Sequence, residues 1–156
     1  MEGTDLKVSL GCDHAGYELK EFLKPELIAM GHEVIDHGTN SLDPVDYPDY
    51  CVAAAGSVVA GKADFGVVIG GSGQGEQIAA NKVHGIRAAL CVNEYLAHLA
   101  RAHNDANVIS FGARILAREY ALEILKVFLS TPFEGGRHVA RLEKIARIEK
   151  VQSGKA

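Results

Sequence analysis

A glycine-rich segment at residues 64–82, DFGVVIGGSGQGEQIAANK, contains the residues best suited to chemistry. Four glycines fall within positions 70–75, between an apolar β-branched run and a helix-forming run. Glycine lets the backbone approach a ligand closely, and free N–H groups at the start of a helix favour an anion. Ser72 and Glu76 add a hydroxyl and a carboxylate to this turn. A carboxylate beside an anion site is unfavourable unless it takes a proton, so Glu76 is a candidate general base.

The spacing of these glycines differs from the two best-known phosphate-binding motifs. A P-loop requires Lys and then Ser or Thr after its last glycine, whereas Gly75 is followed by Glu76 and Gln77. The dinucleotide fingerprint is G-x-G-x-x-G on the first strand, whereas this G-x-G-x-G pattern follows the third predicted strand. The segment therefore predicts anion binding without indicating a nucleotide. A tight strand-to-helix turn with no ligand is the alternative.

Other charged residues form pairs along the chain. Asp13 and His14 directly follow the first predicted strand, where they could contact a ligand, although Asp13 could instead cap the next helix. Arg137 and Arg141 lie four residues apart on one face of the last predicted helix, a spacing that suits a phosphate. The alternative for these arginines is a solvated face that pairs with Glu143.

Four further positions are single candidates. His103 and Asn104 end the fourth predicted helix, where a histidine more often interacts with the helix dipole. Arg114 follows the fifth strand and could contact phosphate or form a structural ion pair, and Tyr47 could form the wall of a pocket. The seven histidines show neither HxH nor HExxH spacing, so the sequence predicts no metal site.

Five apolar segments alternate with helical segments. The predicted strands are 6–11, 32–37, 65–69, 86–92 and 107–111, and the predicted helices are 17–30, 50–60, 76–83, 94–103, 115–129 and 136–150. Pro25 is expected to kink or break the first helix. The alternation predicts an α/β fold, a three-layer α/β/α doubly wound five-stranded parallel sheet in the order 2-1-3-4-5, with a C-terminal helix.

This topology selects a place for the site. Ligands in such sheets bind beyond the C-terminal strand ends at the switch point, which here lies between strands 1 and 3. Asp13–His14 and the 70–76 loop meet there. His103 and the start of the last helix lie at the opposite edge, so a catalytic His103 would have to serve a partner subunit in a two-fold dimer.

Length and composition indicate an ordinary globular chain. Its 156 residues predict one domain over 1–150 and a tail at 151–156. With 47% apolar residues, 23% charged residues and a net charge of −4, no nucleic-acid or membrane partner is expected. The acidic start at residues 1–5 is unlike a signal peptide. Cys12, Cys51 and Cys91 form neither a disulfide framework nor a zinc pattern, so a cytoplasmic location is expected.

Several segments match one family in order: GCDHAG, DYPDY, GGSGQGEQIAANK, ARAHNDANVISFGAR and a final R-x-x-x-R. From about Lys7 to Glu149 the chain resembles the type B ribose-5-phosphate isomerases, within the family that includes galactose- and allose-6-phosphate isomerases. The resemblance implies metal-free, cofactor-free interconversion of D-ribose 5-phosphate and D-ribulose 5-phosphate through a cis-enediolate, a step of the pentose phosphate pathway. With His103 at the opposite edge, a homodimer with shared sites is expected, with pairing into tetramers left open.

The resemblance also implies roles for individual residues. Asp13 and His103 would open the furanose ring, with Asn104 helping to position it, and Ser72 would contact the O1 and O2 hydroxyls. Backbone N–H groups at Gly71, Gly73 and Gly75 would hold the oxyanion. The residues expected at the phosphate or sugar end are His14, Arg114, Arg137 and Arg141.

One position departs from many members of that family. Their proton-transferring base is a cysteine at the end of strand 3, where this chain has Gly70. The chain resembles the subgroup in which a loop glutamate is the base, and Glu76 stands at that position.

Alternative functions are isomerisation of a six-carbon sugar phosphate and sugar-phosphate or nucleotide sensing without catalysis. An NAD-dependent oxidoreductase is disfavoured by the glycine spacing.

Overall fold

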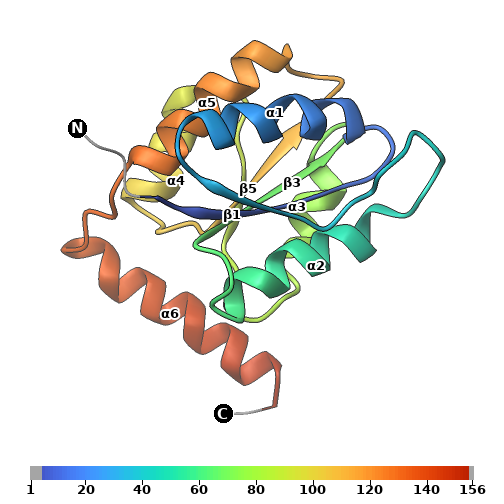
Figure 1. Ribbon diagram of the computed structural model, residues 1–156. Helices are drawn as coiled ribbons and strands as arrows, with labels where there is room; N and C mark the ends of the chain where they lie inside the picture. Colours follow the sequence, from blue (N-terminus) through green and yellow to red (C-terminus); the bar gives the residue numbers. More distant parts are fainter. Residues whose placement is uncertain (1–4, 155–156) are drawn as a thin grey trace.

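Five parallel strands form a single sheet in the computed structural model, which describes residues 5–154 (Figure 1). The strands are β1 (Lys7–Cys12), β2 (Glu33–Asp36), β3 (Phe65–Gly70), β4 (Ala88–Leu90) and β5 (Val108–Gly112). Every residue of β5 is buried, as is all of β3 except Phe65, and apart from Ser110 both strands are runs of apolar residues and glycine. Such runs are expected of strands that are covered on both faces.

Helices cover both faces of the sheet, as predicted. The larger core lies between the sheet and α1 (Tyr17–Ala29), α4 (Glu94–Ala102) and α5 (Arg118–Ser130). The smaller core lies beneath α2 (Tyr47–Val59) and α3 (Gln74–Ala80), where alanines let the helices approach the strands closely. The last helix, α6 (Arg137–Gln152), extends away from these layers at the lower left of Figure 1.

The predicted strand order was wrong at one end of the sheet. The observed order is β2-β1-β3-β5-β4, so the last two strands exchange places relative to 2-1-3-4-5. β4 has only three residues and is half-buried, which suits an edge, whereas the five buried residues of β5 require a neighbour on each side. The switch point between β1 and β3 is unaffected by the exchange.

Several element ends also differ from expectation. α1 runs unbroken through Pro25, which is exposed, so the predicted break is wrong. α2 begins at Tyr47 rather than Tyr50, since Pro48 is well suited to the first turn of a helix. α6 ends at Gln152, so the expected tail begins later than predicted; residues 1–4 and 155–156 lie outside the described part of the chain. Among the described helices, none has both the length and the apolar character needed to cross a bilayer.

A buried ion pair fixes the chain beside the end of β1. The Lys20 ammonium is fully buried and lies 2.7 and 2.8 Å from the two carboxylate oxygens of Asp36. Asp36 also accepts the Gly38 N–H at 2.8 Å, and the Gly38 carbonyl accepts the Cys12 N–H at 2.8 Å. This chain of bonds joins α1 to the end of β2 and holds the following loop against the C-terminal end of β1.

Candidate active site

Glu76 lies in the first turn of α3, directly beyond the end of β3. Its side chain is buried, with the residue only 4% exposed, and Oε2 has no hydrogen-bond partner within residues 5–154. Burial raises the pKa of the Glu76 carboxyl above its ordinary value, and the negative charge of Asp13 raises it further. A buried carboxylate with a free oxygen and a raised pKa is suited to accept a proton.

Asp13 reaches the same edge of the sheet from the end of β1. Its N–H donates to the Ile69 carbonyl at 3.3 Å, and its Oδ1 accepts the Gly16 N–H at 3.1 Å. Gly16 is the cap residue of α1 and no side chain of the described residues caps this helix, so the capping alternative for Asp13 is wrong. One carboxylate oxygen is used in this turn, and the charge of Asp13 still acts on Glu76. The structure therefore brings Asp13 and Glu76 together, as the switch-point argument predicted.

The glycine-rich loop is held rigidly against the end of β5. The Ala113 N–H donates to the Gly70 carbonyl at 2.7 Å, and the Ser110 hydroxyl donates to the Gly73 carbonyl at 2.7 Å. Gly73 has a positive φ of 79°, and a Cβ built there would lie 2.6 Å from Leu90 Cδ1. Both the backbone conformation and the available space therefore require glycine at this position.

Side chains on either side complete this loop. Ser72 is exposed, and its Oγ accepts the Gln74 N–H at 3.3 Å, which leaves its own O–H free to donate. The Tyr47 ring packs so closely on Gly75 that a Cβ there would overlap it, so Tyr47 lies against the loop. Within residues 5–154, the N–H groups of Gly71 and Gly75 donate to no backbone carbonyl. These free donors are available to an anion.

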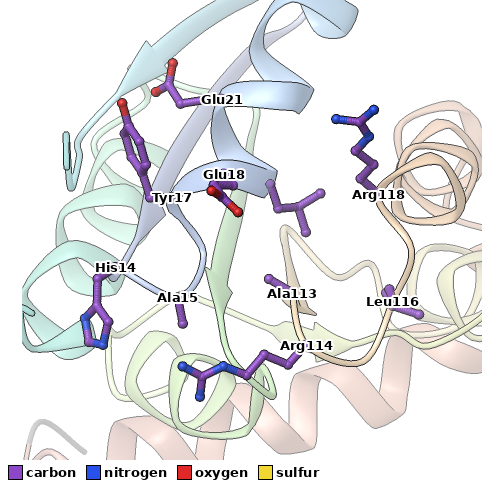
Figure 2. Close-up of a pocket in the computed structure, with 10 residues that line it drawn as sticks. His14, Ala15, Tyr17, Glu18, Glu21, Ala113, Arg114, Leu116 and Arg118 are labelled. Carbon is purple, nitrogen blue, oxygen red and sulfur yellow. The ribbon is translucent and has the colours of Figure 1, made fainter. Parts of the chain in front are cut away.

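A cavity of about 950 Å³ opens beside the loop, between the start of α1 and the β5–α5 connection (Figure 2). His14 and Arg114 both line it, and Figure 2 shows the Arg114 side chain extending from the end of β5 toward His14. A Cβ built on Gly71 would lie 3.1 Å from Arg114 Nη1, so this guanidinium lies against the loop. His14 Nδ1 accepts the Val45 N–H at 3.2 Å, which fixes the ring.

The remaining predicted residues lie at the opposite edge of the sheet. His103 follows the last residue of α4, and the Asn104 carbonyl accepts Arg87 Nε at 2.7 Å. Arg87 directly precedes β4, so both residues lie where β4 and β5 begin. Arg137 and Arg141 are exposed on α6. The structure thus divides the predicted residues between two edges and does not bring them together within one chain.

No ion pair involves the candidate phosphate-binding arginines in the part of the chain that the structure describes. Arg114, Arg137 and Arg141 all lack a carboxylate partner there, so the ion-pair alternatives for these residues are not seen. All three guanidinium groups are exposed to solvent. They are free to bind an anion at their respective edges.

Sequence inspection missed one cluster. The His103 ring stacks on the buried His138 ring with centroids 4.2 Å apart, and Glu134 lies against both. The i,i+4 spacing of Glu134 and His138 was a possible signal, but the third member comes from a distant segment. Only the fold could reveal this grouping.

Comparison with known proteins identifies the family. A family model described as Ribose/Galactose Isomerase matches residues 8–145. The chain belongs to this family. It is 46% identical to ribose-5-phosphate isomerase B of Escherichia coli K12 over 143 residues, which cover 92% of this chain and 96% of that protein. The corresponding protein of Mycobacterium tuberculosis H37Rv is 46% identical over 149 residues, covering 94% of this chain and 92% of that protein.

Solved structures of the family share the fold. Ribose-5-phosphate isomerase B of Clostridium thermocellum superimposes with a TM-score of 0.93 at 47% identity, covering 94% of this chain and 99% of that one. The type B ribose 5-phosphate isomerase of Trypanosoma brucei gives 0.89 at 44% identity, covering 93% and 99%. The α/β architecture is therefore that of the ribose/galactose isomerase family.

The cysteines of this family member are poorly placed to act as a base. Cys12, Cys51 and Cys91 are free and buried. Burial raises the pKa of Cys12 and Cys91 to about 12, and burial together with the charges of Glu76 and Asp13 raises that of Cys51. These thiols stay protonated near neutral pH and are weak nucleophiles and bases.

Proposed function

We propose that this chain interconverts D-ribose 5-phosphate and D-ribulose 5-phosphate through ring opening and a cis-enediolate. The observation that carries the proposal is the buried, unpartnered Glu76 carboxylate beside Asp13 and the glycine-rich loop. The names of the relatives, ribose-5-phosphate isomerase B, support this substrate. No step of the proposed reaction requires a metal or an organic cofactor.

Glu76 is the proposed general base. It takes the proton from C2 of the open-chain aldose, the electrons of that bond form the C1=C2 double bond, and the π electrons of the C1 carbonyl move onto O1. A proton then passes from O2 to O1, the C2 carbonyl forms, and the proton held by Glu76 returns to C1. Negative charge develops on O1 of the substrate, and the N–H groups of Gly71, Gly73 and Gly75 are proposed to stabilise it, with Ser72 contacting the hydroxyls. Oriented donors of this kind are worth about 10²–10³ in kcat each.

Ring opening and phosphate binding are assigned to both edges of the sheet. Asp13 and His103 are the proposed acid–base pair for ring opening, and Asn104 positions the ring. His14 and Arg114 would bind one end of the substrate, with the partner's α6 supplying Arg137 and Arg141. This assignment requires a second copy of the chain, because the two groups lie at opposite edges.

The shape of α6 supports a homodimer with shared sites. The helix extends away from the layered body, and Val139, Ile145, Ile148 and Val151 are all more than 40% exposed along it. An apolar helix surface of this kind is normally covered by a partner. A two-fold dimer would cover it and bring His103 to the partner's Glu76 edge. The free cysteines support a reducing, cytoplasmic setting.

The decisive experiment follows ketose formation from ribose 5-phosphate in EDTA, comparing wild type with Glu76→Gln. The wild type should turn over, and the variant should lose about 10²–10⁴ in kcat, the usual contribution of a general base. Glu123→Gln, on the exposed face of α5, is the matched control. Near-normal kcat in Glu76→Gln would exclude Glu76 as the base. An inactive wild type would exclude this substrate and direct the assay to six-carbon sugar phosphates, then to binding without turnover.

A further inference from the structure

Three potential metal ligands converge where α4 ends and α6 begins. His138 Nε2 lies 3.4 Å from Glu134 Oε2, and His103 Nε2 lies 3.9 Å from the same oxygen. The ligand atoms of all three side chains lie within 4.8 Å of one another. The cluster belongs to the edge of the sheet opposite Glu76.

His138 Nε2 forms no hydrogen bond with the rest of the described chain. This nitrogen is buried and has no hydrogen-bond partner within residues 5–154, since its contact with Glu134 lacks hydrogen-bond geometry. A buried polar atom without a partner is unfavourable unless a ligand satisfies it. The side chains of His103 and Glu134 are 33% and 51% exposed, which leaves a path from solvent to that nitrogen.

The backbone already holds the ligands in place. The Glu134 N–H donates to the Ala102 carbonyl at 3.0 Å, which ties the segment before α6 to the end of α4. Glu134 and His138 are four residues apart, so their side chains point to the same side. A site that pre-exists in the folded chain loses little entropy when it binds an ion.

The chemistry of this set selects the type of ion. Two imidazole nitrogens and one carboxylate oxygen are a common ligand set for Zn²⁺, with a fourth position left to water. Zinc bonds of about 2.0–2.2 Å in a tetrahedron place neighbouring ligand atoms roughly 3.3–3.6 Å apart. The distances of 3.4 and 3.9 Å to Glu134 Oε2 are close to this range, so modest side-chain rotation out of the ring stack would complete the site.

We propose that His103, Glu134 and His138 bind one divalent transition-metal ion, best matched by Zn²⁺, and that the bound ion inhibits the isomerase. Inhibition rests on the proposed function, because the ion would occupy the His103 nitrogen that is assigned to ring opening. The enzyme would then be active in chelator and lose activity as zinc is added. Saturating sugar phosphate should in turn weaken zinc binding, since both compete for His103.

Binding is tested by calorimetric titration of the EDTA-stripped full chain with zinc alone, and by the visible absorption of added Co²⁺. One ion per chain is expected, and Glu134→Gln and His138→Gln should each weaken binding at least tenfold, as loss even of a supporting group costs about 10–100-fold. Glu123→Gln and His98→Gln, which alter exposed residues outside the cluster, should bind as wild type does. Unchanged affinity in both cluster variants would overturn the site.

A parallel turnover assay separates the site from its effect. Zinc should inhibit the wild type at the concentrations that fill the site. Each protein is compared with its own zinc-free rate, and Glu134→Gln should need at least tenfold more zinc for the same fractional inhibition. Equal sensitivity of Glu134→Gln would overturn inhibition through this cluster. Zinc binding that is weakened in the cluster variants but does not inhibit turnover would support the site and overturn the role of His103. No turnover in chelator or in zinc would overturn the proposed function, while the calorimetry would still decide the site.

Discussion

The carboxyl group of Glu76 occupies the space in which a side chain at Gly70 would begin. A Cβ built on Gly70 would overlap Glu76 Oε1. Position 70 is where the family resemblance places a cysteine base in many members, so the two possible bases compete for one volume at the end of β3. A side chain at position 70 would therefore displace the Glu76 carboxyl from its observed place, and this geometry supports Glu76 as the base.

Gly70→Ala should displace the Glu76 carboxyl and reduce kcat about 10²-fold, the usual effect of misplacing a catalytic group by about 1 Å. KM should change little, since His14 and the arginines are untouched. The matched control is Gly56→Ala in α2, where a Cβ meets nothing within 4 Å and should leave kcat unaltered. Steady-state kinetics of both variants test this.

The Gly70→Ala chain could also lose stability, and a double variant separates the two effects. Gly70→Ala with Glu76→Ala removes the overlap, so its thermal midpoint should rise above that of Gly70→Ala while kcat stays low. A double variant no more stable than Gly70→Ala would contradict the overlap. Full activity in Gly70→Ala would show that the carboxyl position is not critical.

Glu76→Gln should be more stable than the wild type above neutral pH. Burial raises the pKa of Glu76 in the folded chain. The contribution of the Glu76 carboxyl to folding stability is therefore fully present below its unfolded-state pKa of about 4.3 and is lost as pH rises through its folded-state pKa. Glutamine avoids the buried charge and should add about 1 kcal/mol, or roughly 2–4 °C in Tm. Thermal unfolding at pH 4 and pH 8 measures this, with a smaller difference expected at pH 4. A variant less stable than wild type at pH 8 would contradict it.

The pH dependence of kcat/KM should report the same carboxyl. Because a base must be ionised, activity should fall as pH drops through the raised pKa of Glu76. Asp13→Asn removes a negative charge that raises this pKa, so the acid limb of its residual activity should shift to lower pH. If the low-pH fall in kcat/KM is at the same pH in Asp13→Asn as in the wild type, it arises from a group other than Glu76, however much activity the variant loses.

The sequence predicted the part of the site that depends on local pattern. The alternation of strands and helices located the switch point, and it correctly predicted that Asp13 lies close to the loop that contains Glu76. The exchange of β4 and β5 was missed because it depends on how completely each strand is buried, and Ala88–Leu90 reads as apolar although it is half-exposed. The His103–Glu134–His138 cluster was missed because its members join only when α6 returns to the end of α4.

The separation of Glu76 from His103 predicts that two inactive variants restore each other. In a two-fold dimer with shared sites, a heterodimer of Glu76→Gln and His103→Gln carries both defects in one site and none in the other. Random 1:1 mixing makes half of the dimers heterodimers, so unfolding and refolding the mixture should recover about a quarter of the wild-type rate. The matched control mixes Glu76→Gln with Asp13→Asn, whose defects lie at the same edge and leave no intact site. Absence of recovery in the first mixture, with heterodimers confirmed by mass spectrometry, would show that the sites are not shared.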